Sequence, residues 1–189
     1  MPLNSKKKIL GVYYPPGDKS ISHRSLILTG QAVGKSEITN LLEGEDVINT
    51  LLVMRELGAR ITKKDGKYLV FGITPGALFQ PAKQLDFGNS GTGIRLLAGL
   101  IASNNINATL KGDNSLSKRP MRRVTDHLKR IGASIELKKN LFPPIKIKGV
   151  GNAIPLDYDI KIPSAQIKSA IMLSALNTNG IVKIKEFKS

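Results

Sequence analysis

Three segments of this sequence place small residues directly before a run with helical periodicity, beginning at Gly17, Gly88 and Pro163. Backbone N–H groups at such a helix start lack partners and lie at the positive end of the helix dipole, so they bind phosphate or carboxylate well. One loop of this kind is most often a capped helix start. Three in equivalent positions favour an anionic ligand.

Side chains strengthen this interpretation at the first two loops. Lys19 and Arg24 add positive charge to the start of the first expected helix. Ser20 and Thr92 add hydroxyl donors. Donors and cations of this kind bind charged oxygen atoms through strong hydrogen bonds.

A second source of positive charge is the run Lys118-Arg119-Pro120-Met121-Arg122-Arg123, with Pro120 expected at the first helical position. Cations at a helix N-terminus are unfavourable unless an anion offsets them. Arg119, between a loop and a proline, is the ligand candidate because a guanidinium binds carboxylate or phosphate with two parallel hydrogen bonds. Arg122 and Arg123 are expected on a solvated basic face.

Other polar residues have simpler explanations. His23 and His127 are the only histidines, and their spacing predicts no metal site, so both are expected to be structural or solvent-facing. Glu43, Glu45 and Asp46 crowd one turn, which is compatible with acid–base chemistry or a metal. An acidic group before a helix is most simply its N-terminal cap, and we favour that role here.

These residues lie on an internal repeat of loop, apolar-faced helix, strand, second helix and paired strands. Helices are expected within 17–30, from 46, and within 88–100, 121–130 and 163–176; strands are expected up to 38 and at 60–62, 68–71, 108–111, 134–137, 145–147 and 181–184. Gly58 and Gly132 would end the second helices. The pattern predicts an α/β (α+β) fold with pseudo-threefold packing around buried helices.

Composition narrows the class of partner. The chain has 29 Lys and Arg against 14 Asp and Glu, a formal net charge of +15, so the partner is expected to be anionic. Aromatic residues make up only 5%, with no Trp, which favours a small anion over nucleic acid. There is no Cys and no apolar run of membrane-spanning length, so we expect a cytoplasmic protein with no thiolate chemistry and no membrane partner.

Four motifs in this order resemble those of the enolpyruvyl transferase family that makes 5-enolpyruvylshikimate 3-phosphate. They are Gly17–Arg24, Gly88–Thr92 with Arg95, Gly112–Met121, and Ser164–Ser169. The match covers nearly the whole chain, and four motifs in the correct order and spacing are far more specific than any one alone.

The resemblance implies one domain of a two-domain fold, with three βαβαββ units per domain and helix N-termini that point into a cleft. Residues 17–189 would form the first domain, with units at about 17–85, 86–153 and 154–189, the third incomplete. Residues 1–16, including a strand at 9–14, would pair with a second, C-terminal domain that is missing here.

The resemblance also implies residue roles. Lys19 would be catalytic, contacting both the phosphate of phosphoenolpyruvate and the attacking 5-hydroxyl of shikimate 3-phosphate. The residues that would bind shikimate 3-phosphate are Lys19, Ser20, Arg24, Ser164, Ala165, Gln166 and Ser189. Family members can have a second Ser at the position of Ala165, so that phosphate contact would fall to the backbone.

The residues that would bind phosphoenolpyruvate are Lys19, Gly91, Thr92, Arg119 and Gln166, with Gln166 bridging both substrates. The family's inhibitor glyphosate would lie close to the backbone of Gly91. The implied reaction transfers the enolpyruvyl group to the 5-hydroxyl and releases phosphate, without metal or cofactor, on the way to aromatic amino acids. The family's acid–base residues lie mainly in the second domain, so this chain alone is expected to be inactive.

Two other families share related repeats. An enolpyruvyl transferase acting on a UDP-sugar uses a Cys acid, which this sequence lacks, and has Asn where Ser20 stands. A binding module like that of RNA 3′-phosphate cyclase would also be basic. It would not explain Ser164-Ala165-Gln166.

Overall fold

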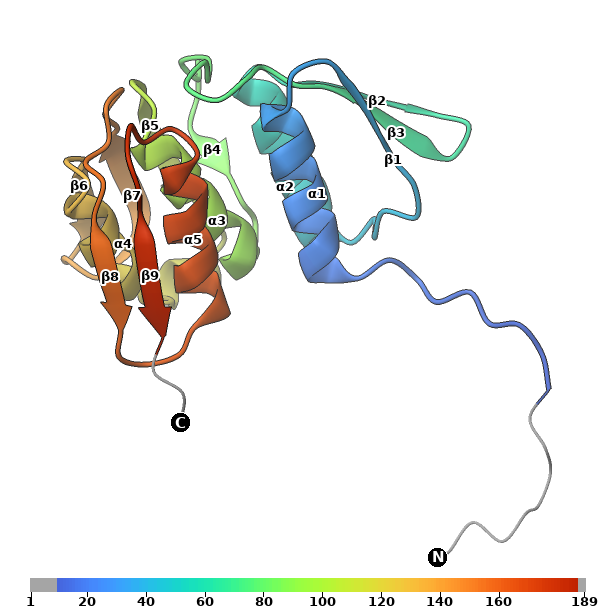
Figure 1. The fold of residues 1–189 in the computed structure, drawn as a ribbon. Helices are drawn as coiled ribbons and strands as arrows, with labels where there is room; N and C mark the ends of the chain where they lie inside the picture. The colour runs from blue at the N-terminus through green and yellow to red at the C-terminus, as the bar shows by residue number, and fades with distance from the viewer. Residues whose placement is uncertain (1–9, 187–189) are drawn as a thin grey trace, which may run out of the picture.

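The computed structural model describes residues 10–186 (Figure 1). The helices are α1 (Lys19–Gln31), α2 (Glu45–Glu56), α3 (Gly91–Ala102), α4 (Arg122–Lys129) and α5 (Ala165–Ala175), with a 3₁₀ turn η1 (Leu116–Lys118). The strands are β1 (Lys35–Ile38), β2 (Arg60–Lys64), β3 (Lys67–Phe71), β4 (Leu85–Asp86), β5 (Asn107–Lys111), β6 (Ser134–Lys138), β7 (Phe142–Lys148), β8 (Asp157–Ile160) and β9 (Lys183–Glu186).

The strands form three separate sheets. Their orders are β1-β3-β2, β4-β5-β7-β6 and β8-β9. The first sheet is antiparallel, the second joins a parallel β4–β5 pair to antiparallel β5–β7–β6, and β8 pairs parallel with β9. This mixed α/β architecture agrees with the fold class expected from the repeat.

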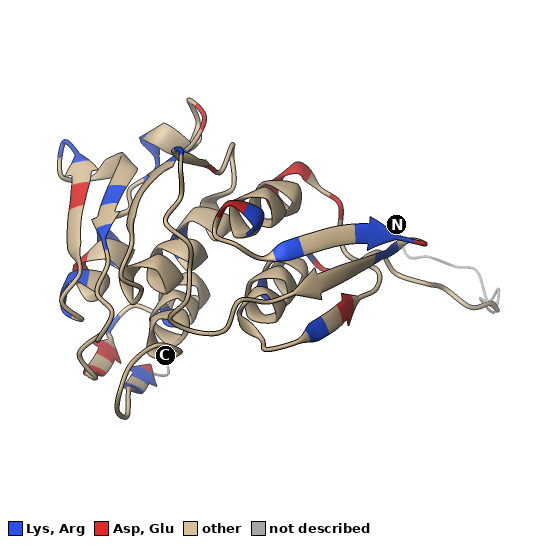
Figure 2. Ribbon diagram, turned by 90° about the horizontal axis from the view of Figure 1, so that it is seen from above, with Lys and Arg blue, Asp and Glu red and all other residues tan. Residues whose placement is uncertain are grey.

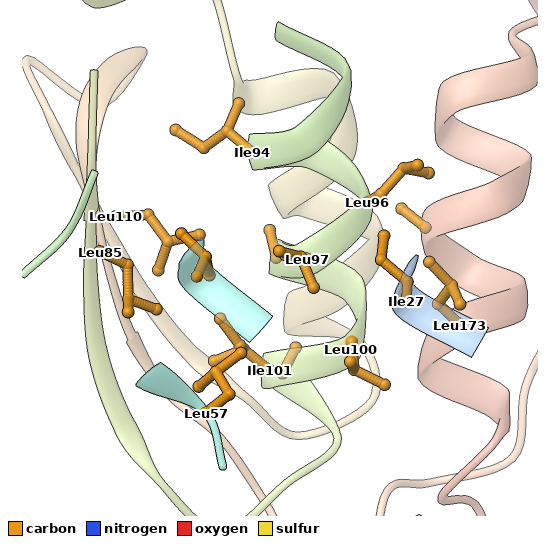
Figure 3. Packing of buried hydrophobic residues seen from close by; sticks show 14 of the residues in the cluster. Ile27, Leu57, Leu85, Ile94, Leu96, Leu97, Leu100, Ile101, Leu110 and Leu173 are labelled. Carbon is orange, nitrogen blue, oxygen red and sulfur yellow. The ribbon is translucent and has the colours of Figure 1, made fainter. Parts of the chain in front are cut away.

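Helix α3 forms the centre of the core. Ten of its twelve residues are buried, because its sequence is apolar on every side rather than along one stripe. Leu97 and Ile101 point toward the second sheet, where Leu110 lies, whereas Leu96 points toward α5 (Figure 3). At Gly99 a methyl group would lie 2.1 Å from the carbonyl oxygen of Ala170, so only glycine allows α5 to pack this closely.

The second helices of the first two units end where the sequence indicated. Gly58 and Gly132 have φ of +109° and +104°, a left-handed conformation that glycine adopts without strain. Their amides donate to the carbonyl oxygens of Arg55 and Lys129. Gly58 and Gly132 therefore each end a helix and turn the chain toward a strand.

Some elements differ from the sequence expectation. The short strand β4 and the strand β8 were not expected, since neither two residues nor the alternation Asp-Tyr-Asp-Ile stands out in one sequence. Residues 10–18 form neither helix nor strand, and Leu10, Val12 and Tyr13 are largely exposed. The pairing of residues 1–16 with a second domain thus stays a prediction.

Helices α1, α3 and α5 open the three units, and the second helices of the first two units, α2 and α4, each pack against two of them. Helix α2 packs against α1 and α3, and α4 packs against α3 and α5. The groove between α1 and α5 is open instead, with Leu28, Met172 and Leu176 about half exposed around an apolar pocket of about 150 Å³. This groove is where the second helix of the third unit would be expected.

The first turns of α1, α3 and α5 lie at the same end of the molecule, the lower end in Figure 1. Lys and Arg residues, in contrast, are spread over many strands and loops (Figure 2). The net positive charge therefore does not locate a site, whereas the shared end of three helices does.

Within residues 10–186, no helix combines the length and apolar character needed to cross a membrane.

Candidate anion-binding site

The first wall of the candidate site is the start of α1. Asp18 caps this helix, because its carboxylate accepts a hydrogen bond of 2.7 Å from the amide of Ile21. Lys19 and Ser20 follow in the first turn and are exposed, and Arg24 is exposed one turn later. The Lys19 ammonium forms an ion pair with Asp46 of α2.

The start of α3 lies beside this wall. Ser90 is fully buried as the helix cap and accepts a hydrogen bond of 3.0 Å from the amide of Gly93. Gly91 and Thr92 then form the first helical residues. The Arg119 guanidinium lies over this turn and donates to both the backbone carbonyl and the side-chain oxygen of Asn89. Arg119 is thus held by neutral acceptors in the described residues.

The start of α5 is the third part of the candidate site. Ser164 caps α5 through the amide of Ile167 at 3.4 Å. The Gln166 side chain donates to Thr92 Oγ1 at 3.1 Å and accepts from Arg95 Nη1 at 3.1 Å. The structure therefore brings together Gly91, Thr92, Arg119, Ser164 and Gln166, which the sequence placed on three separate segments.

Arg95 is a further candidate for the site, which the sequence interpretation named only within a motif. Its guanidinium donates to the carbonyl oxygens of Gly91 and Pro120 at 3.0 and 3.1 Å, in addition to Gln166. Burial, and then the positive charges of Arg119 and Arg123, lower the pKa of Arg95. Nothing about Arg95 alone in the sequence signals this, although it follows Gly91 by one helical turn.

Three guanidinium groups therefore gather beside two helix N-termini. Among the ion pairs of the described residues, none joins Arg95, Arg119 or Arg123 to a carboxylate. A pocket of about 260 Å³ lies beside two of these groups, lined by Arg95, Pro120, Arg123, Val124, Ser164, Gln166 and Ile167. Clustered cations without counter-ions repel one another, and a bound anion would relieve that repulsion.

The basic run 118–123 needs one correction. Helix α4 begins at Arg122 with Met121 as its cap, so Pro120 lies before the helix rather than at its first position. Arg123 is exposed, as expected for a solvated face, and it also lines the pocket beside Arg95. Arg122 is confirmed as a solvated residue, exposed and paired with Asp126 one turn away.

The acidic turn before α2 also differs from expectation. Gly44, not an acidic residue, is the cap, and no side chain caps the helix. Glu45 and Asp46 lie in the first turn, where a negative charge is favourable at the positive end of the dipole. Asp46 pairs with Lys19, and Glu43 pairs with Lys63.

At the start of α5 an internal carboxylate occupies part of the expected phosphate loop. Glu186 of β9 accepts a hydrogen bond of 3.3 Å from the Ser164 amide and pairs with Lys168. The hydrogen bond from Lys168 lowers the pKa of Glu186, against a smaller opposing effect of desolvation. Ala165 is exposed beside this contact. Ser189 lies outside the described residues.

Neither histidine belongs to a metal site, and the described residues hold no group of three His, Cys, Asp or Glu side chains that could bind a metal. His127 contacts the ring of Tyr158 at a centroid distance of 5.7 Å. His23 is fully buried, and its Nδ1 shares a hydrogen bond of 2.8 Å with Thr50 Oγ1. His23 thus has a structural role, as expected.

His23 should make the stability of the chain depend on pH. Burial lowers its pKa to about 4, with Asp46 opposing the shift and Lys19 adding to it. Since the unfolded chain binds a proton near pH 6.5 and the folded chain does not, stability is full above that pH and is lost as pH falls toward 4. Urea unfolding should show a loss of roughly 2 kcal/mol between pH 6.5 and 5.

The control is His23→Gln, which cannot titrate and can still bond Thr50. Its unfolding free energy should change less than that of the wild type over the same pH range. Parallel pH profiles for the two proteins would mean that His23 is not responsible.

Comparisons with known proteins show the family of this chain. Residues 3–189 match the family model of EPSP synthase (3-phosphoshikimate 1-carboxyvinyltransferase). A 3-phosphoshikimate 1-carboxyvinyltransferase of Novosphingobium aromaticivorans is 49% identical over 90% of this chain and 39% of its own length. The relative of that name from Zymomonas mobilis is 47% identical over 98% of this chain and 42% of its own.

A solved structure supports the same relationship. The EPSP synthase of Acinetobacter baumannii superposes with a TM-score of 0.89 at 38% identity, covering 95% of this chain and 41% of that one. The chain thus spans about two fifths of the length of the relatives it matches. By family model, sequence and structure alike, the chain belongs to the EPSP synthase (3-phosphoshikimate 1-carboxyvinyltransferase) family.

Proposed function

We propose that this chain supplies one wall of a site in which the enolpyruvyl group passes from phosphoenolpyruvate to the 5-hydroxyl of shikimate 3-phosphate, with release of phosphate. The observation that carries the proposal is the cluster of Arg95, Arg119 and Arg123, which pair with no carboxylate of residues 10–186, beside the N-termini of α3 and α5. Two phosphates and two carboxylates must approach one another in this reaction. Dense positive charge and aligned amides offset their repulsion.

In this proposal the two substrates bind to different parts of the wall. Phosphoenolpyruvate binds at Gly91, Thr92 and Arg119, next to the pocket that Arg95 and Gln166 line. Shikimate 3-phosphate binds through its carboxylate to Ser20 and Arg24, and through its phosphate to the Ser164–Ala165 loop. For the phosphate to enter that loop, Glu186 has to leave the Ser164 amide.

The chemistry adds a proton to the methylene carbon of phosphoenolpyruvate while the 5-hydroxyl oxygen attacks its neighbouring carbon and loses its proton. The resulting tetrahedral ketal loses phosphate, and removal of a methyl proton restores the carbon–carbon double bond. Lys19 is the residue of this wall that we assign to the attacking hydroxyl and the phosphate. Its ammonium stabilises the negative charge that develops on both oxygens.

The partner that completes the site is, in this proposal, the C-terminal domain of the same enzyme. One observation supports it, because the relatives are more than twice as long as this chain. A second wall would bring the acid–base groups and exclude water from the cleft.

The 189-residue chain alone is expected to bind shikimate 3-phosphate weakly, with a dissociation constant in the millimolar range, and not to turn over. One wall supplies anion contacts but does not position both reactants. Calorimetry measures binding, and a phosphate-release assay measures turnover. Steady-state turnover by the chain alone would contradict our assignment of the acid–base groups, and the absence of any binding would contradict the proposed site.

A further inference from the structure

The Lys19–Asp46 ion pair distinguishes Lys19 from the other cations assigned to the site. Within the described residues, Arg24, Arg95 and Arg119 form no ion pair, whereas Lys19 is neutralised by Asp46. The Lys19 side chain is 51% exposed and that of Asp46 only 22%. The carboxylate is therefore the more fixed member of the pair, and the ammonium is the member free to move.

Buried contacts beneath Asp46 fix the position of its backbone. Thr50 donates a hydrogen bond of 3.3 Å to the backbone carbonyl of Asp46 and bonds His23 of α1. Thr50 and His23 are both fully buried. The first turn of α2 is thus joined to α1 below the ion pair, which places the Asp46 backbone within reach of Lys19.

The same turn of α2 also contacts the loop that leads into α3. Asn49 donates to the carbonyl oxygen of Phe87 at 3.3 Å. At Gly88 an added methyl group would lie only 2.5 Å from the Asn49 amide nitrogen, so the two segments touch. Asp46 therefore lies between the α1 and α3 helix starts, and its negative charge lies between two places where anions would bind.

We propose that Asp46 is a positioning residue that holds the Lys19 ammonium in the ligand-free chain and is displaced from it by the phosphate of phosphoenolpyruvate. This inference rests on the proposed function, since it assigns Lys19 to that phosphate. Binding then replaces the Lys19–Asp46 ion pair by one between Lys19 and the phosphate. The free energy needed to break the Lys19–Asp46 pair weakens the binding of phosphoenolpyruvate. Asp46 thereby keeps Lys19 from binding a stray anion tightly before both substrates are present.

The test compares phosphoenolpyruvate and inorganic phosphate binding, measured by calorimetry at low salt, in four proteins: wild type, Asp46→Asn, Lys19→Met and the double variant. Asp46→Asn should tighten binding about fivefold, the size expected for a half-exposed ion pair. In the Lys19→Met background the same change should have almost no effect. Coupling of this kind does not arise if Asp46 only supports the fold.

Glu43→Gln is the matched control, because it removes one negative charge from the same segment, and Glu43 pairs with Lys63 rather than a site residue. Its effect on affinity should stay below about twofold. Weaker binding by Asp46→Asn, or equal tightening with Lys19 absent, would overturn the inference while leaving the proposed function intact.

A measurement without ligand separates the two proposals further. The rate at which acetic anhydride modifies Lys19, followed by mass spectrometry, should rise about threefold or more in Asp46→Asn and stay unchanged in Glu43→Gln. An unchanged rate at Lys19 would show that Asp46 does not hold it, whether or not the chain binds phosphate. A faster rate together with no anion binding by the wild type would contradict the proposed function, and with it the displacement of Asp46 by phosphate.

Discussion

Replacing Arg119 by alanine is expected to weaken phosphoenolpyruvate binding, and kcat/KM in the completed enzyme, by about 10- to 100-fold. The guanidinium lies over the first turn of α3, where Asn89 orients it. A bidentate contact between this group and a phosphate or carboxylate is charge-assisted, and hydrogen bonds of that kind contribute about 1.5–3 kcal/mol each. The measurements are calorimetry on the chain and steady-state kinetics on the enzyme completed by its second domain.

The control for this prediction is Arg122→Ala. Arg122 lies three residues further along, is exposed, and pairs with no described carboxylate other than Asp126, so its loss should change kcat/KM less than twofold. Arg123 is a poorer control than the sequence suggested, because it lines the pocket with Arg95. Equal losses from Arg119→Ala and Arg122→Ala would remove the reason for assigning Arg119 to the ligand.

Gly91→Ala is expected to raise the inhibition constant for glyphosate at least about tenfold while raising KM for phosphoenolpyruvate by less. The added methyl group would lie 3.0 Å from Arg119 Nη1 and 3.1 Å from Arg95 Nη1. Both guanidinium groups must then shift by a few tenths of an ångström. The longer inhibitor fills more of the space beside this backbone, so the narrowed site should discriminate against it.

Backbone conformation does not require glycine at this position. Gly91 is absent from the residues with positive φ and is the first residue of α3, where alanine is the better helix former. Gly91→Ala should therefore fold with unchanged thermal stability. Gly151→Ala makes the same change where an added methyl group meets only Asn105, and it should alter neither constant. Equal loss of both affinities, or unfolding, would show that Gly91 serves the backbone.

The sequence predicted well what depends on short-range physics. The starts of α1, α3 and α5 follow capping residues that stand in the sequence, namely Asp18, Ser90 and Ser164. The stops at Gly58 and Gly132 follow from the conformation that glycine allows. The small-residue loops at Gly17, Gly88 and Pro163 located the three helix starts, and hence most of the candidate site, although the capping residues themselves were not named from the sequence.

Contacts between distant segments were harder to predict. Gln166 meets Arg95 across 71 residues and Thr92 across 74, and no periodicity within either segment encodes that pairing. Asp46 resembled a helix cap by its position, yet its partner is Lys19, on another helix. The repeat indicated that the helix starts are equivalent, but only packing around α3 decides which side chains meet.

The most direct test of the central claim is an NMR titration of the ¹⁵N-labelled chain with shikimate 3-phosphate, followed by phosphoenolpyruvate. The claim is that the starts of α1, α3 and α5 form one anion-binding surface. We predict the largest changes in backbone amide chemical shift at Ser20, Thr92 and Gln166. Lys146 and Lys148, on β7 of the second sheet, should change little. Shifts centred on those two lysines, or uniformly small shifts that follow added salt, would contradict the account.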